Sequence, residues 1–161
     1  ATISPARGGK STFVNQFLKE TPHCMLVCAD DIRLALTGQR YNQLVEDYVS
    51  GIKYTMIRAF LQRGLDVIND ATNTTPSSIK KLLKLDPDAQ FVWIPNMKQY
   101  ITGYFEMAKI CIDRALKTNQ PDLIPVIDRM CKQCHDLSFE FECGNINLWR
   151  EEARKEINHI V

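Results

Sequence analysis

Four short apolar runs, separated by longer segments of helical periodicity, constrain the fold of this chain most strongly. The runs lie within residues 1–3, 25–28, 65–68 and 90–94, and polar residues follow each of them. Strands this short and continuously apolar are typical of a parallel sheet that is buried on both faces by helices. We therefore predict an α/β fold in three layers, with a parallel sheet of about 4–5 strands and helices on both faces.

The segments between and after these runs have the periodicity of amphipathic helices. In the clearest of them, apolar residues from Leu44 to Phe60 recur every four positions. The predicted helices cover residues 10–20, about 30–38, 41–63, 77–85, 97–117, about 123–135 and about 148–160. Because no repeat, linker or change of composition interrupts the pattern, we predict a single domain over residues 1–161.

Composition excludes several classes of protein. The chain has 161 residues, of which 45% are hydrophobic, and this is enough for a real core. Its net charge of +1 excludes a strongly basic surface, so any nucleic acid must be held by a local patch. No apolar run is long enough to span a bilayer, and no leader sequence is expected. We therefore predict a cytoplasmic protein without a membrane partner, whose six cysteines are reduced.

Three polar clusters follow predicted strands. They are Arg7–Lys10, Asp30–Arg33 and Asp70–Asn73. In parallel α/β sheets, ligands bind beyond the carboxyl ends of the strands. We therefore expect the three clusters to converge on one crevice.

The first cluster belongs to a loop, residues 4–12, that nearly fits the phosphate-binding pattern G-x-x-x-x-G-K-[ST], with Ser4 at the first glycine position. Small residues allow backbone N–H groups to close around an anion, and the following helix directs its positive end toward it. Lys10 would then bridge the outer phosphates and Ser11 would bind Mg²⁺. The alternative is a glycine turn with an incidental lysine.

The other two clusters supply carboxylates and a cation. Asp30 and Arg33 are three residues apart and share a face on a helical first turn. A carboxylate that accepts a proton from an attacking hydroxyl, beside an arginine that holds a phosphate, is a chemically sensible pair. Asp70 stands where a carboxylate would act on Mg²⁺ through water. Alternatively, Asp30 and Asp31 cap the next helix, and residues 70–73 form a turn.

These motifs together resemble those of a known family. Gly9-Lys10-Ser11-Thr12, then Asp30-Asp31-Ile32-Arg33, then Asp70-x-Thr72-Asn73, are similar in order and spacing to the motifs of P-loop kinases. That family includes the bacteriophage and animal polynucleotide 5′-hydroxyl kinases and zeta-toxin-like relatives. The resemblance covers roughly residues 1–143 and implies a three-layer P-loop kinase fold.

The resemblance also implies cofactors, site residues and a partner. ATP and Mg²⁺ are the cofactors, and the 5′-hydroxyl end of a DNA or RNA is the acceptor. Asp30 is the general base, Arg33 orients the acceptor through its adjacent 3′-phosphate, and Arg114 is an arginine of a lid at roughly residues 109–122. Lys117 stands near the place of a second lid arginine. The residues implied at the phosphates, the metal and the floor of the site are Ala6, Arg7, Gly8, Gly9, Lys10, Ser11, Thr12, Asp70, Thr72 and Asn73, with Ser11 and Asp70 binding Mg²⁺ partly through water.

Two other functions stay open. One is a kinase of the same fold for a small molecule, a nucleoside or a nucleotide-sugar. The other is a nucleotide-binding module with little or no transfer activity. Salt dependence separates the acceptors, because a polyanionic oligonucleotide binds more weakly as salt rises.

Two C-terminal features are ambiguous. Cys131, Cys134 and His135 match the C-x-x-C-H haem string, and with Cys143 they could bind zinc, although residues spaced this way on a helix usually just share a face. The helix at roughly 148–160 carries charges that predict a solvated face with pairs such as Glu151–Lys155, or else an interface between subunits.

Overall fold

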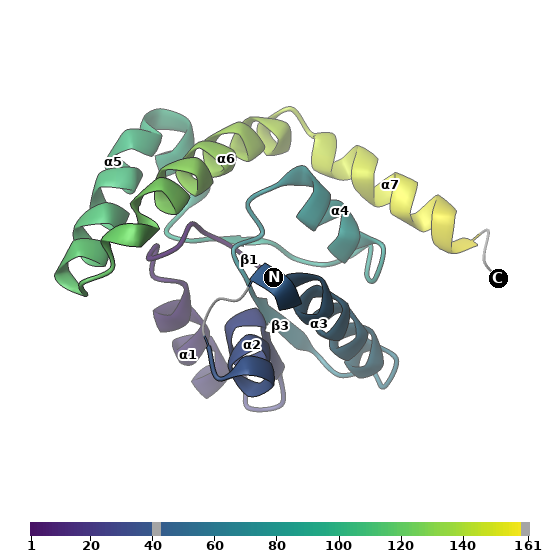
Figure 1. The fold of residues 1–161 in the computed structure, drawn as a ribbon. Helices are drawn as coiled ribbons and strands as arrows, with labels where there is room; N and C mark the ends of the chain where they lie inside the picture. Colours follow the sequence, from purple (N-terminus) through teal and green to yellow (C-terminus); the bar gives the residue numbers. More distant parts are fainter. Residues whose placement is uncertain (40–42, 159–161) are drawn as a thin grey trace. The chain divides into compact units, whose positions relative to one another are not determined.

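The fold is taken from a computed structural model that describes residues 1–39 and 43–158 (Figure 1). The chain divides into two compact units. The first unit comprises residue 1 and residues 11–71, and the second comprises residues 2–10 and the chain from residue 72 onward. Each unit is described by itself below, and the single domain predicted for the whole chain stays a prediction.

A parallel pair of strands forms the centre of the first unit. The elements of this unit are α1 (Lys10–Glu20, whose first residue belongs to the second unit), β2 (Met25–Cys28), α2 (Ala29–Thr37), a 3-10 turn η1 (Gln43–Val45), α3 (Glu46–Leu61) and β3 (Val67–Asp70). The register of β2 and β3 runs from Met25 opposite Val67 to Cys28 opposite Asp70. Parallel pairing is what the continuously apolar runs predicted.

The starts of one helix and one strand in this unit differ from the prediction. Helix α3 begins at Glu46 after the 3-10 turn, whereas the prediction began at residue 41; residues 41 and 42 lie outside the described residues. Strand β3 begins at Val67, two residues later than predicted. The cause is the end of α3: Gly64 has φ +70°, and the N–H of Leu65 donates to the carbonyl of Phe60 over 3.1 Å. Leu65 thus completes the helix C-terminus and is not available to the strand.

The second unit also contains a parallel pair of strands and carries most of the helices. Its elements are β1 (Thr2–Ile3), α4 (Pro76–Leu83), β4 (Val92–Trp93), α5 (Met97–Lys117), a 3-10 turn η2 (Pro121–Leu123), α6 (Ile124–Glu142) and α7 (Asn145–Asn158). Strands β1 and β4 pair with Thr2 opposite Val92 and Ile3 opposite Trp93. The described residues thus contain four strands in parallel pairs, which confirms the α/β class with parallel strands.

Local sequence signals fix where the helices of the second unit begin. Thr75 caps α4 in a capping box with Ser78, and Pro76 occupies the first turn. Asn96 caps α5 by accepting a hydrogen bond from the N–H of Gln99 over 3.2 Å. Helix α5 has the predicted bounds, but α6 continues past the predicted end at residue 135 to Glu142.

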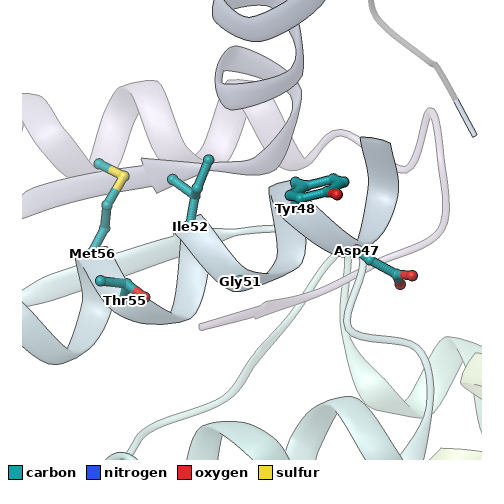
Figure 2. Close-up of a pocket in the computed structure, with 6 residues that line it drawn as sticks. All are labelled: Asp47, Tyr48, Gly51, Ile52, Thr55 and Met56. Carbon is teal, nitrogen blue, oxygen red and sulfur yellow. The ribbon is translucent and has the colours of Figure 1, made fainter. Parts of the chain in front are cut away.

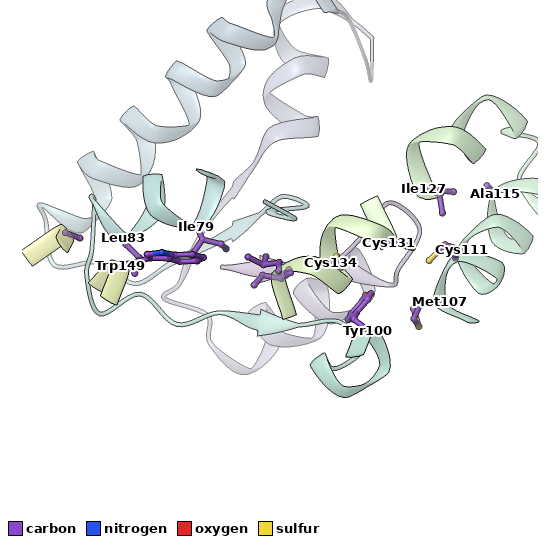
Figure 3. Close-up of a cluster of buried hydrophobic side chains, with 14 residues drawn as sticks. Ile79, Leu83, Tyr100, Met107, Cys111, Ala115, Ile127, Cys131, Cys134 and Trp149 are labelled. Atoms are coloured by element: carbon purple, nitrogen blue, oxygen red, sulfur yellow. The ribbon is translucent and has the colours of Figure 1, made fainter. Parts of the chain in front are cut away.

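A continuous apolar core lies along α4, α5, α6 and α7 (Figure 3). Tyr100 is fully buried there, and its hydroxyl donates to the carbonyl of Ile94 over 2.5 Å. Cys111, Cys131 and Cys134 are fully buried free thiols of the same core. The other buried members are Ile3, Ile79, Leu83, Met107, Ala108, Ala115, Ile127, Leu137, Trp149 and Ala153.

Charged residues of α7 bond within the second unit. The Arg150 guanidinium donates to the carbonyls of Pro87 and Ala89, each over 2.8 Å. Arg154 pairs with Asp88 at 2.6 Å, and α4 contributes further ion pairs, Lys80–Glu152 at 3.7 Å and Lys84–Glu156 at 2.9 Å. These residues therefore join α7 to α4 and to the turn after it. Glu152, Arg154 and Glu156 stay exposed, as the predicted solvated face requires, whereas Arg150 is half-buried.

None of the helices described here combines the length and the apolar character needed to cross a bilayer.

Candidate functional site

Residues 4–10 of the predicted phosphate loop lie in the second unit, directly after β1. The N–H of Ser4 donates to the carbonyl of Thr72 over 3.0 Å, and the N–H of Gly8 donates to the carbonyl of Pro5 over 3.2 Å. The first bond anchors the start of the loop, and the second closes a turn within it. The loop therefore has defined backbone partners at its entrance.

Ser4 fits at the first glycine position because of Gly8. The Ser4 side chain is fully buried, and its hydroxyl donates to the carbonyl of Pro5 over 3.2 Å. A Cβ atom placed on Gly8 would overlap the Ser4 Oγ atom. Ser4 is not among the left-handed residues of the described chain, so its position does not require the freedom of glycine.

In this loop, the residues with a left-handed backbone conformation are Arg7 and Gly9. Arg7 has φ +64° and Gly9 has φ +100°. The Arg7 guanidinium donates from Nη2 to Oε1 of Gln120, which lies just beyond the end of α5. The resemblance placed Arg7 among the residues at the phosphates, but nothing in the sequence pointed to Gln120, because a partner 113 residues away leaves no local signal.

The predicted lid arginine, Arg114, contacts this loop. Its Nη1 donates to the carbonyl of Arg7 over 2.9 Å. The same nitrogen would lie 3.8 Å from a Cβ atom built on Gly9. The structure thus brings Arg114, Arg7 and the glycines of the loop together within one unit.

Thr72 and Asn73 support the loop and the strand that precedes it. Asn73 adopts a left-handed conformation with φ +47°, is 4% exposed, and its Nδ2 donates to the carbonyl of Thr2 over 2.9 Å. Thr72 contributes the carbonyl that holds Ser4. Their position favours a structural floor for the phosphate loop and agrees with the turn expected of asparagine.

The second motif lies in the first unit, at the start of α2. Cys28 is the residue that caps this helix, and its side chain makes no capping hydrogen bond. Asp30 and Asp31 lie in the first turn. The alternative that the two aspartates are helix caps is therefore wrong, although carboxylates in a first turn still interact favourably with the helix dipole.

Arg33 is held by two carboxylates. Its Nε and Nη2 donate to the two carboxylate oxygens of Glu46, over 2.5 and 3.1 Å, and its Nη1 donates to Oδ1 of Asp30. Burial would lower the pKa of Arg33, but the hydrogen bonds and charges of Glu46 and Asp30 outweigh it, so the pKa is raised. The predicted Asp30–Arg33 contact is present. Glu46 was missed, and its only local signal is an acidic residue in the first turn of α3.

Asp70 lies at the same end of the β2–β3 pair. It is the last residue of β3, where the prediction put it after the strand, and it stands opposite Cys28 in the register. Burial raises the pKa of the Cys28 thiol, and the charges of Asp70 and Asp31 raise it further. The carboxylates of the second and third motifs thus lie around one strand end, while Ser11 is exposed on the first turn of α1.

The residues that line the groove in Figure 2 belong to none of these motifs. The groove has a volume of about 410 Å³ and is lined by Asp47, Tyr48, Gly51, Ile52, Thr55 and Met56, all of α3. None of the predicted site residues lines it.

The cysteine and histidine string of α6 does not form a metal site in this structure. Cys131 and Cys134 are buried in the core, whereas Cys143 is exposed. In the part of the chain that the structure describes, no three histidine, cysteine, aspartate or glutamate residues are placed to hold a metal ion together.

The predicted site residues therefore form two groups. The second unit gathers the phosphate loop through Lys10 with Thr72, Asn73 and Arg114, and the first unit carries Ser11, Thr12, Asp30, Arg33 and Asp70. The convergence of the two groups on one crevice stays a prediction.

Comparison with known proteins gives a family and a fold. Residues 8–93, just over half of the chain, match the family model described as an AAA domain. The structure is similar to a chain in the "Structure of the Pnkp1/Rnl/Hen1 RNA repair complex", with a TM-score of 0.66 and 22% identity over 86% of this chain. This chain spans 44% of the length of that one. No curated protein matches the sequence.

These matches agree with the motifs of the sequence. The family match begins inside the phosphate loop and extends through Asp30, Arg33 and Asp70 to the end of β4. The fold match covers a larger share of the chain, 86%. The predicted resemblance to polynucleotide kinase-like P-loop kinases is therefore confirmed, and this chain belongs to the AAA domain family with a P-loop kinase fold.

Proposed function

We propose that this protein is an ATP- and Mg²⁺-dependent kinase that transfers the γ-phosphate of ATP to the 5′-hydroxyl of a DNA or RNA end. The observation that carries the proposal is the contact of Arg114 with the carbonyl of Arg7 in the phosphate loop. Phosphoryl transfer depends on positioning and on cations that stabilise the charge of the transferred group. An arginine bonded to the loop itself supplies such a cation.

The residues present suit ATP and Mg²⁺. Lys10 follows the glycines of the loop, and the Gly8 position has no room for a side chain beside Ser4, which suits a loop whose backbone closes around phosphate. The Ser11 hydroxyl and the Asp70 carboxylate are oxygen ligands of the kind that Mg²⁺ prefers. Mg²⁺, when bound, neutralises charge on the outer phosphates.

Asp30 would act as the general base. Its carboxylate is exposed and would accept the proton of the attacking hydroxyl. Arg33 has five N–H donors, of which three are engaged by Glu46 and Asp30. The two that are left suit two oxygens of a phosphate, which favours an acceptor that carries a phosphate next to its free hydroxyl.

The acceptor follows from the resemblance and from one comparison. The similar chain is part of what is named an RNA repair complex, and the polynucleotide kinase-like family phosphorylates nucleic acid ends. We also propose that the protein is cytoplasmic.

We further propose that copies of this chain associate through α7. The contact would be made by the exposed residues of α7 that do not bond to α4.

The test is a transfer assay with several acceptors. The protein is incubated with ATP labelled in the γ-phosphate and Mg²⁺, against 5′-hydroxyl DNA, 5′-hydroxyl RNA and a panel of nucleosides. We expect label on an oligonucleotide, with acceptor binding that weakens as salt rises. Label on nucleosides alone would identify a small-molecule kinase. Nucleotide binding without transfer to any acceptor would identify a nucleotide-binding module.

A further inference from the structure

The phosphate loop contains an arginine where the backbone favours glycine. Arg7 has φ +64°, a conformation that costs energy for any residue with a Cβ atom. Residues persist in such conformations only where the surrounding structure holds them, and they cluster at active sites and ligand-binding sites. An arginine at this position therefore costs conformational energy that a glycine would not, and a function of its side chain would explain why it is there.

Gln120 fixes the direction of this side chain. The Arg7 Nη2 donates to Gln120 Oε1, and the backbone N–H of Gln120 donates to the carbonyl of Ala115 over 2.9 Å. Gln120 is thereby tied to the last turn of α5, the same helix that carries Arg114. A long, flexible side chain is thus held by a partner whose own backbone is fixed.

The charge of this arginine is not neutralised by its partner. Gln120 is uncharged, and within residues 1–39 and 43–158 neither Arg7 nor Arg114 forms an ion pair with a carboxylate. Arg33 and Arg154, in contrast, each pair with at least one carboxylate. Two guanidinium groups that pair with no carboxylate among the described residues therefore belong to this loop or contact it, and this arrangement suits a polyphosphate.

We propose that the Arg7 guanidinium contacts the γ-phosphoryl group of ATP and stabilises its charge during transfer, with Gln120 as the residue that positions it. The inference rests on the proposed kinase function. In the reaction, the acceptor oxygen forms a bond to the γ-phosphorus, the bond from that phosphorus to the β–γ bridging oxygen breaks, ADP leaves, and the hydroxyl proton passes to Asp30. Arg7 and Arg114 take no part in the exchange of atoms and act through charge and hydrogen bonds.

The test compares Arg7→Gly, Arg7→Lys and Gln120→Ala with Arg63→Ala. Arg63 is an exposed arginine whose guanidinium donates to the carbonyl of Ala59 in the preceding helix α3, and so it is a matched loss of an arginine. Glycine suits φ +64°, so Arg7→Gly keeps the loop and the melting temperature. We expect Arg7→Gly to lower kcat by about 100-fold or more, and Arg7→Lys by less because lysine keeps the charge. Arg63→Ala retains the wild-type rate.

Gln120→Ala distinguishes positioning from a structural role. We expect it to lower kcat by about 10-fold in wild-type protein and to have no further effect in Arg7→Gly, because it acts only through Arg7. If the two substitutions multiply their effects, Gln120 acts independently and its assignment is overturned. A wild-type rate in Arg7→Gly overturns the assignment of Arg7 and leaves the proposed kinase intact.

Calorimetry keeps the inference testable if the wild-type protein transfers phosphate to no acceptor, a result that would overturn the proposed function. The probes are then ATP and ADP, each with Mg²⁺. If Arg7 contacts the γ-phosphate, Arg7→Gly reduces the preference for ATP over ADP by about 10-fold. An unchanged preference overturns the assignment of Arg7.

Discussion

Glu46 accepts hydrogen bonds from both Nε and Nη2 of Arg33, over 2.5 and 3.1 Å, and so occupies one whole edge of the guanidinium. The two residues are thirteen positions apart in the sequence and lie on different helices. The bond joins the first turn of α3 to α2 and fixes the plane of an arginine that is only 15% exposed. The remaining edge of Arg33 is thereby oriented before any ligand binds.

Replacing Glu46 by Ala tests this orientation. Arg33 would lose its bidentate partner, and we expect the KM for the oligonucleotide to rise by about 10-fold while the KM for ATP stays unchanged. The free energy of unfolding should fall by roughly 1–2 kcal/mol, since hydrogen bonds between charged groups are strong but this pair is partly exposed. Steady-state kinetics and urea denaturation measure the two effects. An unchanged acceptor KM would show that Arg33 does not contact the acceptor.

Replacing Asp30 by Asn removes the proposed base with little change of shape. We expect transfer to fall by about 10²–10⁴-fold, the range for a lost general base, while calorimetry shows ATP affinity close to that of the wild type. Asp128→Asn, an exposed aspartate of α6, is the matched control and should transfer normally. Full activity in Asp30→Asn would assign the base to another residue.

Thr75→Ala tests the start of α4. The Thr75 side chain accepts a hydrogen bond from the N–H of Ser78 and completes the capping box. Loss of such a cap costs about 1 kcal/mol. We expect the urea midpoint to fall with no change in the denaturant slope, and Thr75→Ser, which keeps the hydroxyl, to restore most of the loss.

Alkaline pH should destabilise the fold through its buried core. Burial raises the pKa of the Cys134 thiol and of the Tyr100 hydroxyl, and charge on neighbouring thiols raises them further. Both groups stay protonated in the folded chain at pH values where the unfolded chain has lost the proton. Their contribution to stability is thus complete below the unfolded pKa values, about 8.5 for cysteine and about 10 for tyrosine, and is lost as pH rises above them.

The measurement is the unfolding free energy between pH 7 and pH 10.5. We expect it to be flat at first and to fall above about pH 8.5. Cys134→Ala should reduce the slope in the range where thiols titrate, although it lowers stability at every pH by leaving a small cavity. Stability that rises with pH in this range would contradict the prediction.

Much of the fold is readable because its signals are local. Helix α5 keeps the predicted bounds since Asn96 starts it and Thr118-Asn119 ends it, all within a few residues. The β3 boundary was wrong because Leu65 is apolar enough for a strand, yet its N–H completes the end of α3. Helix α6 passes the predicted end because residues up to Glu142 continue to pack in the core through Phe141.

Some residues of the candidate site could likewise be predicted from local motifs, and others could not. Lys10, Asp30 and Asp70 were identified because each follows a strand within a recognisable motif. Glu46 and Gln120 were not, because each contacts an arginine through a bond that only the folded chain forms. Ser4 looked like a departure from the loop pattern, and only the structure shows that the empty space at Gly8 receives its hydroxyl.

The overlap of Ser4 and Gly8 also constrains how this loop can diverge. A side chain at position 8 displaces the Ser4 hydroxyl, whereas glycine at position 4 would release that space. Positions 4 and 8 should therefore change together in evolution. Homologues that have gained a residue with a Cβ atom at position 8 should have lost the serine at position 4. An engineered library should randomise both sites at once.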